Sequence, residues 1–516
     1  MAANVFLLHT VSRLRSFFAT SLPFTNQNQN QNQNPCTSVP PASKSQSKSK
    51  CQSTCFPLFI SHAVTVNGAH SAPMFADSGI MLFLLFQEMG FNDKDARVIL
   101  DTNAALTYLP SDHIRSRIQL LQSVGLKGLA LSRVALKRPD VLTAPEIDAI
   151  LSVIVDGDDL DLKGKIEPAQ IERLLTGTDP RFLVGFETKL RLLLQFGIPK
   201  EKLGKVLNTV NLAKALCFKS SEEMERLLAF LHPFGGADLV LRWPAILNYD
   251  LDSQLMPRIG YLLELSGQDH HATATVLRKF PSALAYSLDH LKDHVEFLKS
   301  YAGLSYEEIF RVILVYPSLF SASRKRKLHP RIDFLKQCKL SSGDIYRFLI
   351  RAPLFLSLSF EENLANKLVF LVKIGYKNRT KELAMAMGAV TRCSCKNFQA
   401  VVGVLLSYGL SCRDILEMSK KHPQVLQYNH KSLEDKLEYL TQEMGREVGE
   451  LLSFPAFLGY KLDGRIKHRY EERRKVLGEG MSINKLLSVS TASFASTSRK
   501  KPISEADENE EEMSQN

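Results

Sequence analysis

The feature of this 516-residue chain that most limits its fold is a proline that recurs after an apolar run. Four of these prolines lie 36 or 37 residues apart, and a leucine or phenylalanine follows each of them three residues later. Self-similarity at such a period is typical of stacked structural repeats. Two wider gaps each match about two periods, which predicts units without a proline near residues 211 and 389 and about ten units in total. The recurring prolines are Pro139, Pro180, Pro244, Pro281, Pro317, Pro353, Pro423 and Pro455.

Each unit also carries the pattern of two helices. A leucine ten or eleven residues after the proline opens an apolar stripe at spacings of four and seven, such as Leu328, Ile332 and Leu335, which is one face of an α-helix. A second helix begins at a capping signal, as at Ser305 with Glu308, and stops before the proline, which lacks an amide donor and restricts its predecessor. We therefore predict an all-α fold, a curved α-solenoid of about ten helix-turn-helix repeats of roughly 30–37 residues, each closed by a proline-led turn.

Composition divides the chain into four predicted regions. Residues 1–76 contain no Asp or Glu and are typical of an organellar transit peptide followed by a disordered leader, although a basic disordered tail would have the same composition. The hydroxyl-rich start favours the chloroplast, in its stroma or nucleoid, and an Arg-bearing amphipathic stretch at 5–18 leaves the mitochondrion as the alternative. We expect an N-terminal helical cap at 77–125, the repeat domain at 126–477, and a disordered tail at 478–516 that is acidic at its end.

Signals of catalysis, metal binding or membrane insertion are weak. The pair Cys393-x-Cys395 does not have the spacing of a zinc site, and packed small residues explain it better. The longest apolar run near the leader, Ile80–Phe86, is far shorter than a membrane span. An acidic stretch at 156–167 has Asp161 where a calcium loop needs glycine, and the chain has no phosphate-cradling loop or nucleophile elbow. We expect a monomeric binding protein with no catalytic residues, no metal and no cofactor.

Basic residues recur at fixed places in the unit, and the chain has a formal net charge of +11. Such residues suit phosphate backbones, although basic residues near helix C-termini also complement the helix dipole and exposed helices are commonly basic. One predicted row lies three residues after the first-helix leucine: Arg258, His294, Arg331, Lys367 and Lys436. A second row lies just ahead of the prolines: Arg138, Arg242, Lys279, Arg351 and Lys421. A block behind Pro317 comprises Arg324, Lys325, Arg326 and Lys327, and the last helix adds Arg465 and Arg469.

The segments FPSALAYSLDHLKDHVEFLKS and YPSLFSASRKRKLHPRIDFLKQ resemble the repeating unit of the mitochondrial transcription termination factor family, which is large in plant organelles. The resemblance covers roughly residues 126–477 and rests on a register that is repeated many times. It implies a curved helical solenoid whose positively charged inner surface holds nucleic acid. The units near 211 and 389 depart from the pattern, because they lack its proline.

The resemblance and the basic rows together predict an organellar protein that binds double-stranded DNA through a basic concave groove and regulates transcription, most of all termination. Organellar transcription machinery is a further expected partner. An RNA binder in transcript splicing or maturation is one alternative, and a protein–protein scaffold is another. A groove dominated by arginine, with few exposed aromatic side chains, favours duplex over single strands.

Overall fold

The computed structural model describes residues 74–155, 160–477 and 482–488. The predicted transit peptide at 1–76 therefore lies almost wholly outside the described residues. The chain divides into two compact units, one that ends at Asp148 and one that begins at Ala149. Each unit is described by itself.

Every regular element of the described residues is helical, and none of them is a strand. In the unit that ends at Asp148, α2 packs against α3 and α4, and α3 packs against α5. Helix α6 (Pro145–Val155) spans the division between the units. The bounds in the first unit are α2 (Met74–Glu88), α3 (Asp93–Thr102), α4 (Ser111–Ser123) and α5 (Leu129–Lys137).

The second unit contains the remaining helices, which follow one another in pairs. Their bounds are α7 (Pro168–Gly177), α8 (Phe186–Gln195), α9 (Lys200–Thr209), α10 (Ser221–Leu231), α11 (Gly236–Arg242), α12 (Met256–Leu265), α13 (His270–Lys279), α14 (Leu288–Ala302), α15 (Tyr306–Val315), α16 (His329–Gln337), α17 (Ser342–Arg351), α18 (Ala365–Ile374), α19 (Lys381–Val390), α20 (Cys395–Ser407), α21 (Cys412–Lys421), α22 (His430–Glu438), α23 (His468–Leu477) and α24 (Ile483–Ser488).

All eight predicted prolines start a short 3₁₀ turn. The residue before seven of these prolines has a recurring conformation, such as Tyr316 with φ −138° and ψ 72° or His422 with φ −139° and ψ 78°, whereas Asp179 before Pro180 has φ −67° and ψ 135°. This conformation is outside the α region, as expected for a residue that precedes proline. The turns are Pro139–Leu142, Pro180–Leu183, Pro244–Asn248, Pro281–Ala285, Pro317–Ser321, Pro353–Leu356, Pro423–Gln427 and Pro455–Gly459.

The second helix of several units begins with the predicted cap. At Ser305 the hydroxyl accepts a hydrogen bond from the backbone amide of Glu308, and the Glu308 carboxylate accepts one from the Ser305 amide. The same reciprocal pair occurs at Ser411 with Asp414 and at Ser341 with Asp344, and Ser220 with Glu223 forms one at the start of α10, the first helix of its unit. Because each box pairs two amides that the helix leaves free, it fixes the start of the helix as the proline fixes its end.

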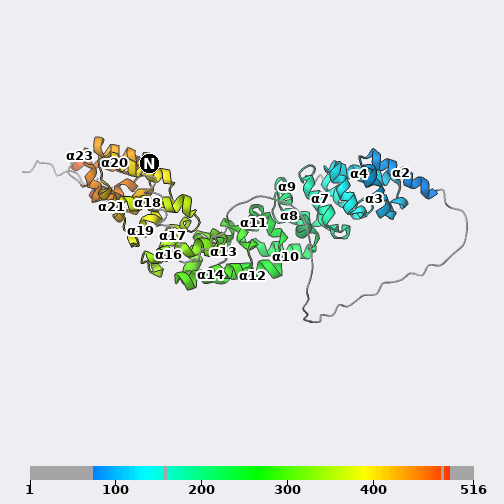
Figure 1. The fold of residues 1–516 in the computed structure, drawn as a ribbon, viewed down its shortest axis with the longest axis horizontal. Helices are drawn as coiled ribbons and strands as arrows, with labels where there is room; N and C mark the ends of the chain where they lie inside the picture. The colour runs from blue at the N-terminus through cyan, green and yellow to red at the C-terminus, as the bar shows by residue number, and fades with distance from the viewer. Residues whose placement is uncertain (1–73, 156–159, 478–481, 489–516) are drawn as a thin grey trace, which may run out of the picture. The chain divides into compact units, whose positions relative to one another are not determined.

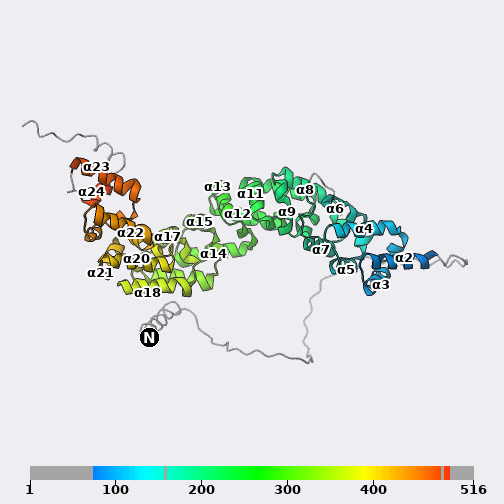
Figure 2. The ribbon, with the colours of Figure 1, turned by 90° about the horizontal axis from the view of Figure 1, so that it is seen from above.

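In the second unit the helices form two layers that run along the chain. Helices α13, α15, α17, α19 and α21 each contact the next of the series, and α18, α20 and α22 do the same in the other layer. Figures 1 and 2 show this succession of neighbouring pairs. The stripe residues Leu328, Ile332 and Leu335 are fully buried between the layers. The prediction of an all-α helical repeat solenoid is confirmed.

The two units without a proline differ from the others and from each other. Near residue 211 a π-type turn, Ala213–Cys217, replaces the 3₁₀ turn. Near residue 389, α19 ends at Val390 and the chain passes through a bend directly into α20, with no 3₁₀ turn between them. Gly388 allows a close approach here, because a Cβ at this position would lie 2.7 Å from the ring of Phe348.

The helical part of the chain extends past its predicted end. The sequence predicted a disordered tail from 478, but α24 is helical and buries Ile483, Leu486 and Leu487. It packs against α23 and the turn at Pro455. No helix among the described residues combines the length and apolar character needed to span a membrane.

Candidate nucleic-acid interface

The first predicted row of basic residues does not form an exposed stripe. Arg331, Lys367 and Lys436 are 4%, 0% and 8% exposed, and His294 is 1% exposed, while Arg258 is half-buried. A phosphate cannot reach side chains at this depth without displacing the next unit. The sequence predicted that this row meets phosphates, and the depth of its buried members does not fit that prediction.

Most of these side chains instead bind the backbone of the following unit. Arg258 donates to the carbonyl oxygen of Leu284 at 2.5 Å, and Lys436 donates to that of Leu458 at 2.8 Å. Both acceptors lie three residues after a proline, at the end of a 3₁₀ turn whose last carbonyls have no partner within the turn. We call this cation-to-carbonyl contact between successive units the joint contact.

The joint contact recurs with different donors. Arg331 donates to the carbonyl oxygens of Phe355, at 2.8 Å, and Leu358. Burial lowers the pKa of Arg331 to about 10, so the side chain still carries its charge at neutral pH. The His294 ring lies 2.9 Å from the carbonyl oxygen of Ala322. A buried carbonyl without a donor is costly, and a charged donor is stronger than a neutral one, so the joint contact stabilises the stacking of units.

Three further joint contacts were not predicted from the sequence. Arg117, 1% exposed, donates to the Val141 carbonyl at 2.7 Å and pairs with Asp148. Lys189 donates to the Leu216 carbonyl at 2.5 Å. Lys219 donates to the carbonyl oxygens of Leu247 and Tyr249, and burial lowers its pKa to about 8. For Arg117 and Lys189 the available signal was spacing, since each follows a buried apolar residue, Ile114 or Phe186, by three positions and so lies on the same helix face.

The two predicted residues of the last helical segment have the same structural task. Arg469, 4% exposed, donates to the carbonyl oxygens of Leu486 at 3.3 Å and Leu487 at 3.2 Å. Arg465 donates to the Leu487 carbonyl at 2.7 Å and stacks over the ring of Tyr460. They hold α24 against the end of the repeat.

The second predicted row is largely exposed. Arg242, Lys279, Arg351 and Lys421 are exposed at or near the C-termini of second helices, whereas Arg138 is half-buried. Arg138 pairs with Asp140 at 2.5 Å, and Arg242 lies 3.7 Å from Asp238. Lys279 reaches the Leu314 carbonyl and Lys421 the Leu452 carbonyl, both at 2.7 Å. These contacts are at the surface, where solvent and phosphate can compete for them.

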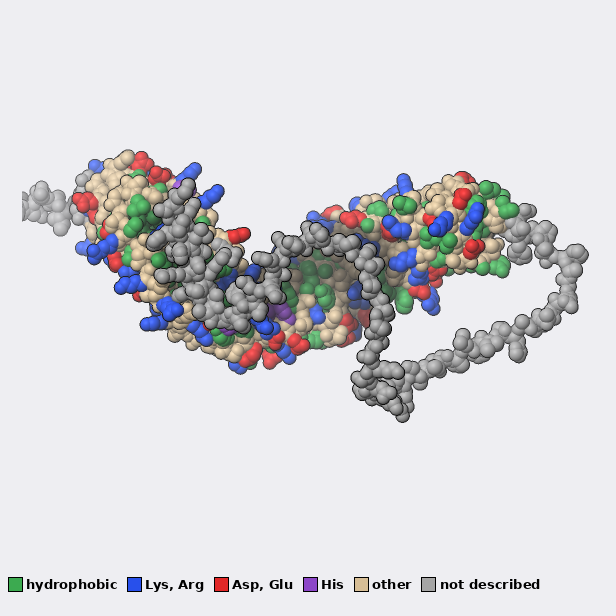
Figure 3. All heavy atoms as spheres, viewed as in Figure 1, with side chains coloured by type: hydrophobic (Ala, Val, Ile, Leu, Met, Phe, Trp, Pro, Cys, Tyr) green, Lys and Arg blue, Asp and Glu red, His purple; other side chains and the backbone are tan. Residues whose placement is uncertain are grey.

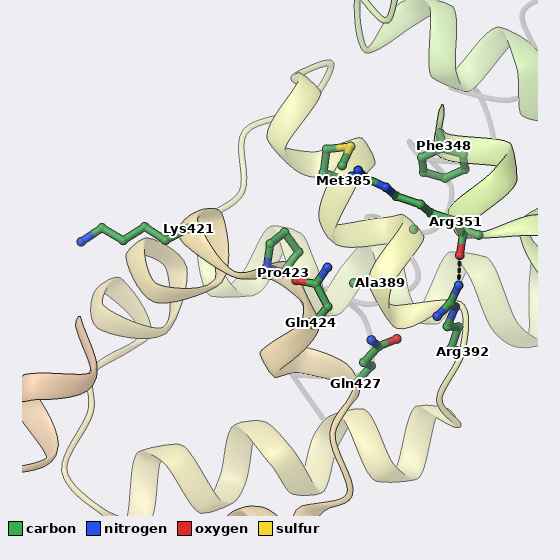
Figure 4. Close-up of a pocket in the computed structure, with 11 residues that line it drawn as sticks. Phe348, Arg351, Met385, Ala389, Arg392, Lys421, Pro423, Gln424 and Gln427 are labelled. Carbon is green, nitrogen blue, oxygen red and sulfur yellow. Dashed lines mark hydrogen bonds between the residues drawn. The ribbon is translucent and has the colours of Figure 1, made fainter. Parts of the chain in front are cut away.

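Basic side chains at or just after the ends of three consecutive second helices line one pocket. The pocket has a volume of about 450 Å³, and its lining includes Arg351, Arg392 and Lys421. Figure 4 shows Arg351 and Arg392 on one side, where Arg392 donates to the Arg351 carbonyl, and the amides of Gln424 and Gln427 in the middle. Lys421 lies on the other side, and its ammonium points away from the pocket. We call Arg351, Arg392 and Lys421 the basic edge. Arg392 was missed because its unit lacks the proline that marked the register.

The basic block behind Pro317 forms the turn that leads into α16. Ser323 caps this turn by accepting a hydrogen bond from the Arg326 amide at 3.3 Å. Arg324 pairs with Asp293 at 2.8 Å, whereas Lys325, Arg326 and Lys327 are exposed. The predicted position of the block, between Pro317 and the next helix, is confirmed.

A groove of about 740 Å³ lies beside the block. Besides the basic side chains it is lined by His290, His294, Phe297 and His329. Burial lowers the pKa of His294, against the effect of two backbone carbonyls that favour its protonated form. The groove combines cations, which bind phosphates, with aromatic rings, on which bases stack.

Basic side chains are widespread on the face of the molecule in Figure 3, interspersed with acidic ones. Among the described residues no cluster of three or more His, Cys, Asp and Glu side chains could hold a metal ion. The candidate interface therefore consists of the basic edge and the basic block, both built on the ends of helices.

Comparison with known proteins gives matches along most of the chain. A family model described as mTERF matches residues 83–374 and 344–495. The chain is 54% identical over 426 residues to the Arabidopsis thaliana protein "Transcription termination factor MTERF8, chloroplastic", covering 82% of this chain and 84% of that protein. It is 27% identical over 197 residues to "Transcription termination factor MTERF15, mitochondrial" of the same species, covering 38% and 43%. It is 26% identical over 274 residues to that species' "Transcription termination factor MTEF18, mitochondrial", covering 48% and 47%.

Proposed function

Because the chain belongs to the mTERF family, as a plastid member of it, we propose that it binds double-stranded DNA and regulates transcription in the chloroplast, acting in termination. The name of the 54% identical relative supports both the compartment and the process. In this proposal the protein works by binding, as an obstacle or a recruiting surface for the transcription machinery, and carries out no chemical step.

The observation that carries the proposal is the basic edge. Arg351, Arg392 and Lys421 are exposed and come from three successive units. A regular row of cations along a rigid repeat can follow the regular phosphates of a duplex backbone. The basic block adds Lys325, Arg326 and Lys327, whose side chains are exposed to solvent.

An RNA-binding role is the second candidate, and the groove beside the basic block favours it. The half-buried ring of Phe297 and the rings of His290 and His329 line that groove. Unpaired bases stack on such rings, whereas paired bases in a duplex cannot. If the protein binds RNA, substitutions in the groove should weaken RNA binding. If it binds duplex DNA, they should leave RNA binding less affected than duplex binding.

The test is a salt titration of binding to duplex DNA, single-stranded DNA and RNA. The edge variant changes Arg351, Arg392 and Lys421 to Gln, and the block variant changes Lys325, Arg326 and Lys327 to Gln. Removing one side chain that binds a phosphate should flatten the slope of log affinity against log salt by about one unit on duplex. A matched control changes Lys200, Lys339 and Lys377 to Gln, which removes three exposed charges at or before the N-terminal ends of second helices.

We expect both variants, and not the control, to flatten the slope on duplex DNA while affinity falls by similar factors on different sequences. Equal slopes in the parent and both variants would show that these side chains are only solvated surface. A Phe297→Leu variant that weakens RNA binding and leaves duplex binding unchanged would favour the RNA role instead.

A further inference from the structure

One joint between units lacks its acceptor. Lys367, on α18, occupies the position of Arg331 in the preceding unit, but the next unit is the one near 389 that has no proline and no 3₁₀ turn. Its side chain is 0% exposed, and its Nζ has no hydrogen-bond partner among the described residues. A buried ammonium without a partner is strongly unfavourable, so the position calls for a negative charge.

Two thiols lie where the missing turn would be. Cys393 is in the bend after α19, and Cys395 is the first residue of α20. The Cys395 Sγ donates to the carbonyl oxygen of Asn363 at 3.9 Å, and Asn363 lies one helical turn before Lys367. Burial lowers the pKa of Lys367, and the charges of Cys393 and Cys395 act in the opposite direction.

The two thiols differ in their surroundings. The Cys393 Sγ donates to two carbonyl oxygens, those of Val390 at 3.4 Å and Leu426 at 3.8 Å, which favours its protonated thiol more than the single, longer contact of Cys395 does. Burial also raises the pKa of Cys393, with Lys367 opposing. Cys395 lies at the N-terminus of a 13-residue helix, directly after the N-cap Ser394. The positive end of the helix dipole favours a negative charge there.

We propose that Cys395 is a site of oxidative modification, where a hydroperoxide converts the thiol into a sulfur oxyanion that the Lys367 ammonium pairs with. In the first step the thiolate sulfur attacks one peroxide oxygen, a sulfur–oxygen bond forms and the oxygen–oxygen bond breaks. The leaving hydroxide or alkoxide takes a proton, so the peroxide is reduced to water or an alcohol and the sulfur becomes a sulfenic acid. A second equivalent gives the sulfinate, which is an anion at neutral pH.

The modification supplies this joint with the ion pair that it lacks. Lys367 gains a charged acceptor from the unit that follows it, just as Arg331 has carbonyl acceptors in the unit that follows Arg331. Oxidation at Cys395 should therefore tighten the contact between α18 and α20, which are neighbours in the first-helix layer. This inference is independent of the nucleic acid that the protein binds.

Cys412 occupies the same helical position as Cys395 and serves as an internal control for its reactivity. It is the first residue of α21, follows the N-cap Ser411, and is exposed, whereas Cys395 is half-buried. Asp414 stands at the third position of α21, where α20 has Asn397. If exposure controlled reactivity, Cys412 would be oxidised first. If Lys367 controls it, the less exposed Cys395 reacts first.

The experiment treats the full-length protein with hydrogen peroxide and follows each cysteine peptide by mass spectrometry over time. We expect Cys395 to gain one and then two oxygen atoms before Cys412 does. Lys367→Met should slow oxidation of Cys395 by a factor on the order of three to ten and leave Cys412 unchanged. Removing a buried unpaired charge should not unfold the chain, and circular dichroism checks this.

Faster oxidation of Cys412 in the unaltered protein would overturn the proposal without any variant. An unchanged Cys395 rate in folded Lys367→Met would overturn it as well. A disulfide between Cys393 and Cys395, seen as a loss of two hydrogen masses in place of added oxygen, would overturn it in favour of a different oxidation chemistry. Cys393→Ser should leave the oxygen gain at Cys395 in place.

Discussion

Two rows of basic side chains run along the repeat domain and have different tasks. The row on the first helices is mostly buried, and members such as Arg331 and Lys436 donate to carbonyls of the next unit. The row at the ends of the second helices, which includes Arg351 and Lys421, is exposed. The difference shows that a basic residue at a repeated position is no evidence of ligand binding until its helix face is known. The predicted consequence is a separation of effects: the buried row sets stability, and the exposed row sets salt-dependent binding.

The largest effect on stability should come from Arg331→Met. The change leaves the carbonyls of Phe355 and Leu358 buried without their donor, which should cost on the order of 3 kcal/mol in the free energy of unfolding. The measurement is urea denaturation followed by circular dichroism. A matched control is Arg311→Met, which removes an exposed arginine paired with Glu307 and should cost less than about 0.5 kcal/mol.

Salt titration of the same protein sharpens the comparison. Arg331→Met should leave the slope of log affinity against log salt unchanged on duplex DNA, because the side chain is 4% exposed. If the slope flattened by about one unit while stability stayed constant, Arg331 would belong to the binding row and the distinction between the rows would fail.

A smaller effect is expected from Pro317→Ala, which tests how the turns present their carbonyls. Proline ends α15 sterically, so the variant allows that helix to extend into the turn that supplies the acceptors Phe320 and Ala322. We expect a loss of about 1–2 kcal/mol and faster hydrogen exchange in α14 to α17 only, because solenoid units contact mainly their neighbours. Uniform changes along the repeat would contradict this.

The control for that variant is Pro330→Ala. Pro330 is the second residue of α16, directly after the helical turn Arg324–Leu328, so its ring does not end a helix there. Both changes increase the conformational entropy of the unfolded chain in the same way. A difference between the two variants in stability or in hydrogen exchange therefore measures the effect of ending α15 at Pro317.

The fold could be predicted from the sequence because its determinants are local. A proline stops a helix through its own ring, and the spacing of Leu328, Ile332 and Leu335 marks a helix face without knowledge of what packs there. The first basic row was misplaced although the same spacing held the answer. A residue three positions after the first leucine lies on the face that the apolar residues at zero, four and seven define, so Arg331 had to point inward.

Other parts of the candidate site depend on contacts that a sequence does not display. Arg392 joins Arg351 and Lys421 only because α17, α19 and α21 lie side by side. Arg465 and Arg469 looked like a basic surface because α24, whose carbonyls they bind, was predicted as part of the tail. The unpartnered state of Lys367 follows from an acceptor that is absent in the next unit, which only the assembled joint reveals.

The smallest expected effect concerns the one joint contact in the first row that uses a histidine. Burial lowers the pKa of His294, whose ring also lies 4.3 Å from that of His290 and is close enough to Arg324 for its charge to act in the same direction. The unfolded chain therefore takes up this proton at a higher pH than the folded chain does. The stability that neutral His294 contributes is present above the unfolded pKa of about 6.5 and is lost as pH falls below it.

The measurement is the free energy of unfolding of the parent and of His294→Gln between about pH 5 and pH 8. Gln cannot titrate. We therefore expect the parent to lose free energy of unfolding relative to His294→Gln as the pH falls. His422→Gln is the control, because burial also lowers the pKa of His422 but its ring binds the Tyr428 hydroxyl within its own unit. The opposite outcome, a parent that gains stability relative to His294→Gln in acid, would have one physical cause. The carbonyls of His290 and Ala322, both within hydrogen-bond distance of the ring, would then hold His294 as the cation, and this joint would follow the same rule as those of Arg258 and Arg331.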